Sequence, residues 1–311
     1  MFQDSRINKV LYGGDYNPEQ WPEEIWEEDM RLFKLAGIDE VTLNVFSWAA
    51  LQPSEDTYNF EKLDKIMDLV EANGLKVFLA TSTAAHPAWM AKRHPDILRT
   101  EFSGMKRKFG SRHNSCQNSP TYQKYSVLLA KKLAERYGER ECVIGWHICN
   151  EYGGECYCEN CEKQFRVWLK EKYGTIEEVN KAWDTSFWGH TFYDWDEIVL
   201  PNMLSEHFEP DRTTFQGISL DYRRFNSEGM LKCYQAEAAA IRSVVPDAKI
   251  TTFNHAGEAI LELANGGVDA IINDKPVTDY ILTQQPKVAK ETVHLPELLT
   301  ADPMGMAVSK D

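Results

Sequence analysis

Short apolar runs rich in β-branched residues alternate with amphipathic segments along most of the chain. The runs cover residues 10–16, 40–46, 77–81, 143–149 and 249–254. Runs of this length are typical of buried parallel strands, and the amphipathic segments between them are typical of crossover helices. This order predicts an α/β fold built on a parallel sheet.

The amphipathic segments carry helix-boundary signals at their ends. The first begins at Pro22, places Trp26, Met30 and Phe33 on one face, and stops at Gly37. Proline at the first helical position and glycine just past the last one are the expected boundary residues. From these boundary residues and the spacing of the apolar positions, helices are expected over residues 22–37, 60–74, 119–138 and 220–244.

The connections between these elements are unequal in length. Two long ones, residues 81–119 and 151–220, hold most of the tryptophan, histidine and cysteine residues of the chain. Long loops on a rigid scaffold are where function usually lies. Only five strands are counted by residue 254, whereas a closed (β/α)8 barrel needs eight.

Glu151 closes an apolar run that begins at Val143, and two glycines follow at 153 and 154. In β/α barrels, residues at the carboxyl end of a strand carry the chemistry. An arbitrary glutamate in such a place would more often be a solvated surface group. Here Asn150 precedes the acid, and three cysteines follow it closely, so an active site is predicted.

Cys156, Cys158 and Cys161 place three thiols on one tight turn, and Cys116 in the preceding long loop is available as a fourth. Four thiolates form a closed tetrahedral site, which suits structural zinc. The alternative is a group of free thiols in a reducing compartment. The other three cysteines are interpreted as small core residues: Cys142, Cys149 and Cys233.

Composition narrows the function classes. The formal net charge is −14 and the isoelectric point is near 5.1, without the clustered basic face that nucleic acid requires. The amino terminus is polar, and no apolar stretch is long enough to span a membrane. Seven cysteines, an odd number, suit a reducing compartment. A cytoplasmic protein with a small neutral or polar partner is therefore expected.

Several long motifs stand out along the chain. They are Gly-Gly-Asp-Tyr-Asn-Pro-Glu-Gln-Trp at 13–21, Thr-Ser-Thr-Ala-Ala-His-Pro at 81–87, Arg-His-Asn-Ser-Cys at 112–116, Asn-Glu-Tyr-Gly at 150–153, Phe-Trp-Gly-His at 187–190 and Asp-Tyr-Arg-Arg-Phe at 221–225. Together they resemble the motifs of glycoside hydrolase family 42 β-galactosidases, and the likeness covers residues 8–254. It implies a TIM-barrel enzyme that removes terminal β-galactosyl units with retention of configuration.

The resemblance also implies roles for single residues. Glu151 matches the family's acid/base, and Asn150 matches its neighbour that contacts the sugar. Arg112 and Trp188 match substrate-binding residues, and the four cysteines Cys116, Cys156, Cys158 and Cys161 match the family's zinc cluster. One departure is Thr42, which stands where some members carry an arginine that touches the sugar.

The family nucleophile has no counterpart in the matching region. A retaining glycosidase needs a second carboxylate roughly 5 Å from the acid/base, and in this family it is a glutamate near the end of the seventh strand. Two hypotheses therefore stay open: a β-galactosidase domain, or a catalytically inactive chimeric fragment that at most binds galactosides. Family members commonly form trimers through a later domain, so a homo-oligomer also stays open.

The last segment, residues 256–311, resembles the carboxyl-terminal lobe of amino-acid-binding proteins from ABC importers. The likeness lies in residues 258–276, which are expected to form a helix from 258, a strand and a turn at Pro276, and in residues 301–308. The expected organisation is thus a truncated barrel domain over 1–255 followed by a foreign α/β segment. A joined reading frame, a natural fusion and a divergent barrel remain alternatives. A strand near residues 268–272 could cover the open edge of the barrel sheet.

Overall fold

The chain forms two compact units, residues 11–250 and residues 1–10 together with 251–311. A computed structural model describes residues 6–7, 9–206, 214–248, 270–284, 286–294 and 304–309. The strand expected at 249–254 and the helix expected from 258 lie outside these described residues.

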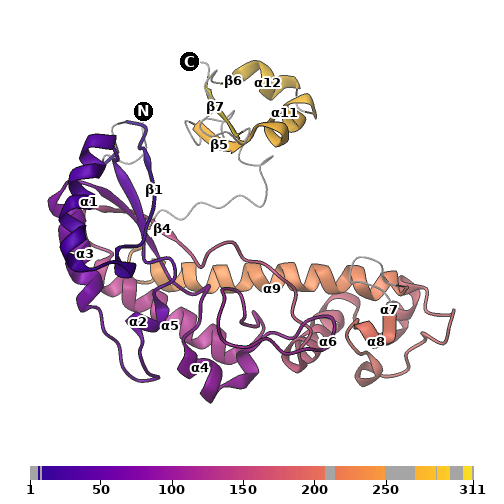
Figure 1. Ribbon diagram of the computed structural model, residues 1–311. Helices are drawn as coiled ribbons and strands as arrows, with labels where there is room; N and C mark the ends of the chain where they lie inside the picture. Colours follow the sequence, from indigo (N-terminus) through magenta and orange to yellow (C-terminus); the bar gives the residue numbers. More distant parts are fainter. Residues whose placement is uncertain are drawn as a thin grey trace. The chain divides into compact units, whose positions relative to one another are not determined.

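A four-stranded parallel sheet lies at one end of the larger unit, beside α1 and α3 (Figure 1). Its strands are β1 (Gly13–Tyr16), β2 (Glu40–Leu43), β3 (Lys76–Ala80) and β4 (Val143–His147). Neighbouring strands follow the order of the chain, and the register aligns Val41 with Val77 and Val77 with Val143. Sequential parallel strands joined by helices are the arrangement of a β/α barrel, so four of the expected strands and the fold class are confirmed.

The four predicted helices are present within a few residues of the expected bounds. They are α1 (Glu23–Ala36), α3 (Glu61–Ala72), α5 (Pro120–Tyr137) and α9 (Gln216–Arg242). Gly37 ends α1 in the left-handed conformation, with φ 73°. The hydroxyl of Ser119 caps α5 by accepting from the backbone N–H of Tyr122 at 3.3 Å. No helix among the described residues is long and apolar enough to cross a membrane.

Shorter elements fill the long connections. They are η1 (Pro18–Gln20), α2 (Trp48–Leu51), α4 (Ala88–Arg93), η2 (Pro95–Ile97), α6 (Glu159–Tyr173), α7 (Ile176–Trp183), η3 (Trp195–Glu197) and α8 (Met203–Glu206). Helix α9 packs along α5 and extends from beside β4 to α6 and α7 (Figure 1). It therefore joins the sheet to the loop region that carries the cysteines.

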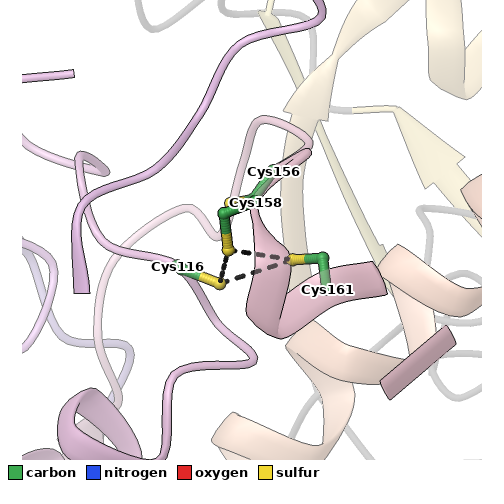
Figure 2. Close-up of side chains that lie close together, drawn as sticks. All are labelled: Cys116, Cys156, Cys158 and Cys161. Carbon is green, nitrogen blue, oxygen red and sulfur yellow. Dashed lines mark hydrogen bonds between the residues drawn. The ribbon is translucent and has the colours of Figure 1, made fainter. Parts of the chain in front are cut away.

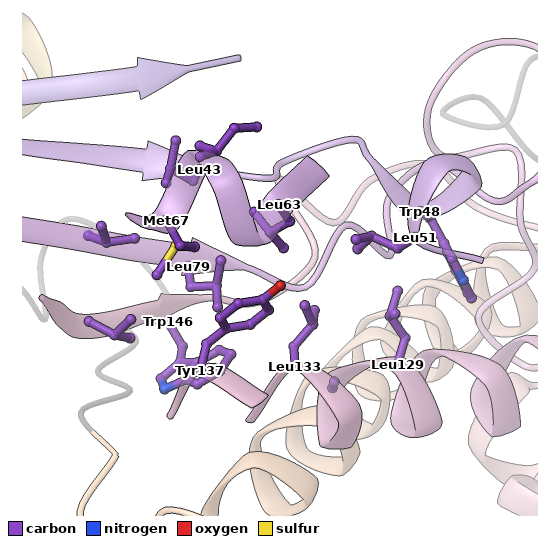
Figure 3. Close-up of a cluster of buried hydrophobic side chains, with 14 of the residues drawn as sticks. Leu43, Trp48, Leu51, Leu63, Met67, Leu79, Leu129, Leu133, Tyr137 and Trp146 are labelled. Carbon is purple, nitrogen blue, oxygen red and sulfur yellow. The ribbon is translucent and has the colours of Figure 1, made fainter. Parts of the chain in front are cut away.

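The main core lies between the sheet and helices α3 and α5 (Figure 3). Side chains from all three elements are fully buried there: Leu43, Met67, Leu79, Leu129, Leu133 and Tyr137. A second buried cluster lies under the long connection after β4, where α6, α7 and α9 meet. Its aromatic members are Phe165, Trp168, Trp183, Tyr222 and Phe225, and it includes three of the four grouped cysteines.

The smaller unit has its own antiparallel sheet in the order β5-β7-β6. The strands are β5 (Ala270–Asp274), β6 (Thr292–His294) and β7 (Met304–Ser309), with helices α11 (Lys275–Gln284) and α12 (Pro286–Glu291). The strand expected near 268–272 is β5, and it pairs with β7. The turn expected at Pro276 is wrong: α11 begins there, because proline is tolerated in the first turn of a helix.

The core predicts a sharp contrast between two adjacent leucines of α5. Leu129 is fully buried, whereas Leu128 is 38% exposed. We expect Leu129→Ala to lower the free energy of unfolding by about 2–5 kcal/mol, because it leaves a cavity. We expect Leu128→Ala, the matched control, to lower it by less than about 1 kcal/mol. Urea denaturation followed by tryptophan fluorescence measures both, and equal losses would contradict this core.

Candidate active site and cysteine cluster

Strained backbone marks the carboxyl edge of the parallel sheet. Asn44, Ser82 and Cys149 follow β2, β3 and β4 by one or two residues, and all three have positive φ, at 69°, 64° and 59°. Each such non-glycine residue costs about 1–3 kcal/mol, and residues of this kind cluster at functional sites. The strand ends therefore agree with the sequence in placing the site at this edge.

Hydrogen bonds between neighbouring loops hold this strained edge together. The Asn44 side-chain amide donates to the Ala80 carbonyl at 3.0 Å. The Ser82 hydroxyl donates to the Asn44 carbonyl and accepts from the Ser47 backbone N–H. The loops after β2 and β3 thus restrain each other, which gives the edge a fixed shape.

Glu151 and Arg112 are brought together at this edge. Arg112 Nη2 lies 2.8 Å from Glu151 Oε2, and the guanidinium of Arg112 lies over the Phe46 ring, 5.9 Å from its centroid. The Glu151 side chain is 70% exposed, and that of Arg112 is 47% exposed. Ion pairs in such exposed positions add little to stability, so the pair orients the carboxylate.

Asn150 is buried beside the acid, with its Oδ1 3.2 Å from His147 Nε2. Its side-chain nitrogen is buried without a hydrogen-bond partner. A buried donor left unpaired costs about 1–3 kcal/mol. The amide nitrogen is therefore suited to donate to an oxygen of a bound molecule.

Trp188 is on the loop after α7, with φ 55°, and its side chain is 67% exposed. Its ring stacks on Phe187, with centroids 5.4 Å apart, and meets His190 edge-on. Among the described residues, no hydrogen bond or ring contact joins Trp188 to Glu151. The structure thus unites Glu151, Arg112 and Asn150, and leaves Trp188 as a separate exposed aromatic surface.

The four predicted cysteines converge on one point (Figure 2). Their Sγ atoms all lie within 4.8 Å of one another, and the three pairs among Cys116, Cys158 and Cys161 are 3.4, 3.5 and 3.8 Å apart. These distances are too long for disulfides. Zinc–sulfur bonds of about 2.3 Å in a tetrahedron place the sulfurs about 3.8 Å apart, so the cluster has the size of a tetrahedral metal site.

The thiols of the cluster influence one another's protonation. Hydrogen bonds from Cys116, Cys156 and Cys161 lower the pKa of Cys158 below its ordinary value. Hydrogen bonding to the other thiols and burial raise the pKa of Cys116. Thiols bind a metal cation as thiolates, so a bound cation would favour loss of their protons.

The cluster lies close in sequence to both members of the exposed ion pair. Cys116 follows Arg112 by four residues, and Cys156 follows Glu151 by five. Arg99 joins the two loops, since its Nη1 donates to the Gly153 carbonyl at 2.9 Å. A Cβ on the next residue, at 154, would lie 1.9 Å from Arg99 Nη1 and would displace this guanidinium, and the φ of 76° at that position also favours glycine.

Sequence reasoning missed Glu237, which lies on α9 and is completely buried. Its two oxygens accept from the Thr83 hydroxyl at 3.0 and 2.9 Å, and Oε1 accepts from the Tyr152 hydroxyl at 3.4 Å. Burial raises the pKa of Glu237 to about 7. The signal was available in its spacing, because Glu237 stands between Cys233 and Ile241 on the buried face of the helix.

Comparison with known proteins identifies the family to which this chain belongs. The family model for β-galactosidases of glycoside hydrolase family 42 matches residues 15–294. The β-galactosidase BgaP of Planococcus sp. is 64% identical over 250 residues, which are 80% of this chain and 37% of the relative. LacZ of Lactobacillus acidophilus is 48% identical over 253 residues, which are 81% of this chain and 38% of the relative.

A solved structure agrees with these sequence relatives. The crystal structure of β-galactosidase from Bacillus circulans sp. alkalophilus matches with 60% identity and a TM-score of 0.77. The match covers 78% of this chain and 36% of that one. The resemblance expected from the motifs is confirmed, and the chain spans little more than a third of the length of these relatives.

The buried carboxyl of Glu237 predicts a pH dependence of stability. The groups facing it are Tyr122, Tyr152, Cys149 and Cys233, none of them a cation, and its pKa is raised from 4.5 to about 7. A raised pKa means that the folded state holds the proton more tightly than the unfolded state. The stability linked to this proton is therefore full below pH 4.5 and is lost as pH rises to about 7.

We expect the free energy of unfolding of the wild-type chain to fall by roughly 3 kcal/mol more than that of Glu237→Gln over this pH interval. The glutamine variant keeps the shape of the side chain and cannot ionise, so it isolates this one proton. Urea denaturation of both proteins at a series of pH values measures the difference. Parallel pH profiles would contradict the prediction.

Proposed function

We propose that this chain, which belongs to the β-galactosidases of glycoside hydrolase family 42, takes part in hydrolysing terminal non-reducing β-D-galactosyl residues. The reaction proceeds with retention of the anomeric configuration. Glu151 is the acid/base in this proposal. The supporting observation is the Arg112–Glu151 pair, 2.8 Å apart, at the strained carboxyl edge of the sheet. That is the edge at which β/α barrels carry their chemistry.

The proposed chemistry assigns one role to each residue. Glu151 protonates the oxygen of the leaving group and later takes a proton from the attacking water. Arg112 holds that carboxylate in place, and the unpaired amide nitrogen of Asn150 donates to a sugar hydroxyl. Trp188 offers an exposed aromatic face, on which the C–H face of a sugar ring can stack.

The proposal does not identify the attacking carboxylate. The family glutamate has no counterpart in residues 8–254, and Glu258, Glu262 and Asp269 lie outside the described residues. Asp274 ends β5 in the smaller unit. Binding of galactosides without hydrolysis is therefore the second candidate function.

We also propose that the four cysteines hold one structural zinc ion. The sulfur separations support this assignment, since they match those of a tetrahedral zinc–thiolate site. Four protein ligands leave no position for water, so the ion would hold the loops together and take no part in hydrolysis. The reduced cysteines also support a cytoplasmic location, where thiols persist.

For the smaller unit we retain the proposal of a foreign segment over residues 256–311, derived from the carboxyl-terminal lobe of an amino-acid-binding protein. Its support is the separate compact unit and the separate antiparallel sheet. The family match to residue 294 runs across this boundary and favours the alternative of a divergent barrel. We assign no function to this unit.

Where the wild-type chain hydrolyses a chromogenic β-galactoside, we expect Glu151→Gln to lose about 100- to 10,000-fold in rate, because general acid–base catalysis contributes that much. Glu159→Gln is the matched control, since Glu159 is an exposed glutamate at the start of α6. Release of the chromophore measures the rate. Equal rates in Glu151→Gln and the wild type would remove Glu151 from the mechanism.

A folded wild-type chain without turnover would reject hydrolysis by this chain and leave the binding hypothesis. Ligand-observed NMR with galactose then decides between the two remaining outcomes. Binding that is lost in Trp188→Ala supports a retained sugar site, and no binding by the wild type rejects it.

We expect the purified chain to contain about one zinc ion, measured by plasma mass spectrometry, and Cys158→Ser to contain much less. Cys142→Ser is the control, because Cys142 is a buried cysteine outside the cluster. Removing the metal with a chelator should lower the melting temperature of the wild type more than that of Cys158→Ser. Full zinc content in Cys158→Ser would contradict the site.

A further inference from the structure

The segment that carries the acid/base has a backbone that its own residues do not favour. Cys149 and Glu151 both have positive φ, 59° and 40°, and Asn150 lies between them. Non-glycine residues persist in this region only when surrounding contacts hold them there. The conformation of residues 149–152 must therefore be imposed from outside the segment.

Part of the restraint comes from the loop after β3. The backbone N–H of Cys149 donates to Thr81 Oγ1 at 2.8 Å, and the Thr81 backbone N–H donates to the His147 carbonyl at 3.0 Å. Thr81 Oγ1 also lies 3.2 Å from Thr83 Oγ1. A chain of buried hydroxyls thus reaches from the acid/base segment to Thr83.

Glu237 completes this chain from α9. Both of its oxygens bond to the Thr83 hydroxyl, and Oε1 accepts from the hydroxyl of Tyr152, the residue after Glu151. The Glu237 carboxyl therefore contacts the loop after β3 through Thr83 and the segment 149–152 through Tyr152. Helix α9 is long and well packed against α5, so it supplies a fixed anchor.

We propose that Glu237 is a positioning residue for the acid/base: by bridging Thr83 and Tyr152, it holds residues 149–152 in the conformation that presents Glu151 at the carboxyl edge of the sheet. This inference rests on the proposed role of Glu151. Glu237 does not contact the reacting atoms in this scheme and acts through Tyr152 and the threonine pair.

Glu237 can bridge its two partners without placing a negative charge in the buried interior. Among the described residues, the ionisable groups near Glu237 are tyrosines and cysteines, which burial keeps neutral. A neutral carboxylic acid both donates and accepts hydrogen bonds, so it can satisfy two hydroxyl partners without a buried charge. Glutamine shares this ability, whereas alanine leaves both hydroxyls unpaired.

Hydrogen–deuterium exchange of the full chain without substrate tests the inference. We expect Glu237→Ala to raise exchange of peptides covering 149–153 by about tenfold or more, because buried hydrogen bonds are lost. Glu237→Gln should restore protection to within a few-fold of the wild type. Ile241→Ala is the matched control, since Ile241 is buried one turn further along α9 without these partners.

Equal exchange of residues 149–153 in Glu237→Ala and Ile241→Ala would overturn the inference, because Glu237 would then be an ordinary core group. If Glu237→Ala does not fold, Tyr152→Phe carries the test: it removes only the hydroxyl, and unchanged exchange would also overturn the inference. The exchange needs no turnover, so a failure of the proposed hydrolysis is seen separately. Where hydrolysis is measurable, Glu237→Ala should lower kcat and leave KM nearly unchanged, and Gln should rescue it.

Discussion

The four Sγ atoms of the cysteine cluster lie within 4.8 Å of one another. They bring together two loops that are not part of the sheet. One loop brings Arg112 and Cys116, and the other brings Glu151 and Cys156. The aromatic cluster of α6, α7 and α9 encloses the sulfurs, and the Tyr222 hydroxyl donates to the Cys156 carbonyl. Arg112 and Glu151 lie on these two loops, outside strands and helices, so contacts between the loops help to set the distance between the two side chains.

A second restraint acts on the other end of the same loop. Where β4 ends, the strained Cys149 is held by Thr81, and Tyr152 is held by Glu237. Residues 149–154 are therefore restrained at two places, by buried hydroxyls on the sheet side and by the cysteines beyond Gly154. Between these restraints the Glu151 side chain stays exposed, and its ion pair with Arg112 orients the carboxylate.

The features that the sequence predicted correctly depend on interactions between residues that are close together in the chain. Gly37 and Ser119 marked helix ends because left-handed glycine and side-chain capping act within a few residues. The cysteine cluster was predictable because three of its thiols lie within six residues of one another. The burial of Glu237 could be predicted from its spacing on α9, but its contact with Thr83 could not, because Thr83 lies 154 residues away in sequence. Pro276 was misread as a turn, since proline marks the start of a helix as readily as a turn.

The exposure of Glu151 sets a condition on how the site works. A glycosidase site excludes water around its reacting groups, whereas the Glu151 side chain is 70% exposed in the described part of the chain. The strands β1 to β4 form one open sheet, and a closed barrel has eight strands. Bound substrate or further strands must therefore cover the carboxylate. The hydrogen bonds through Thr81 and Glu237 and the cysteine cluster fix the backbone around Glu151. Whether its carboxylate can act as a catalytic acid depends on the substrate or strands that cover it.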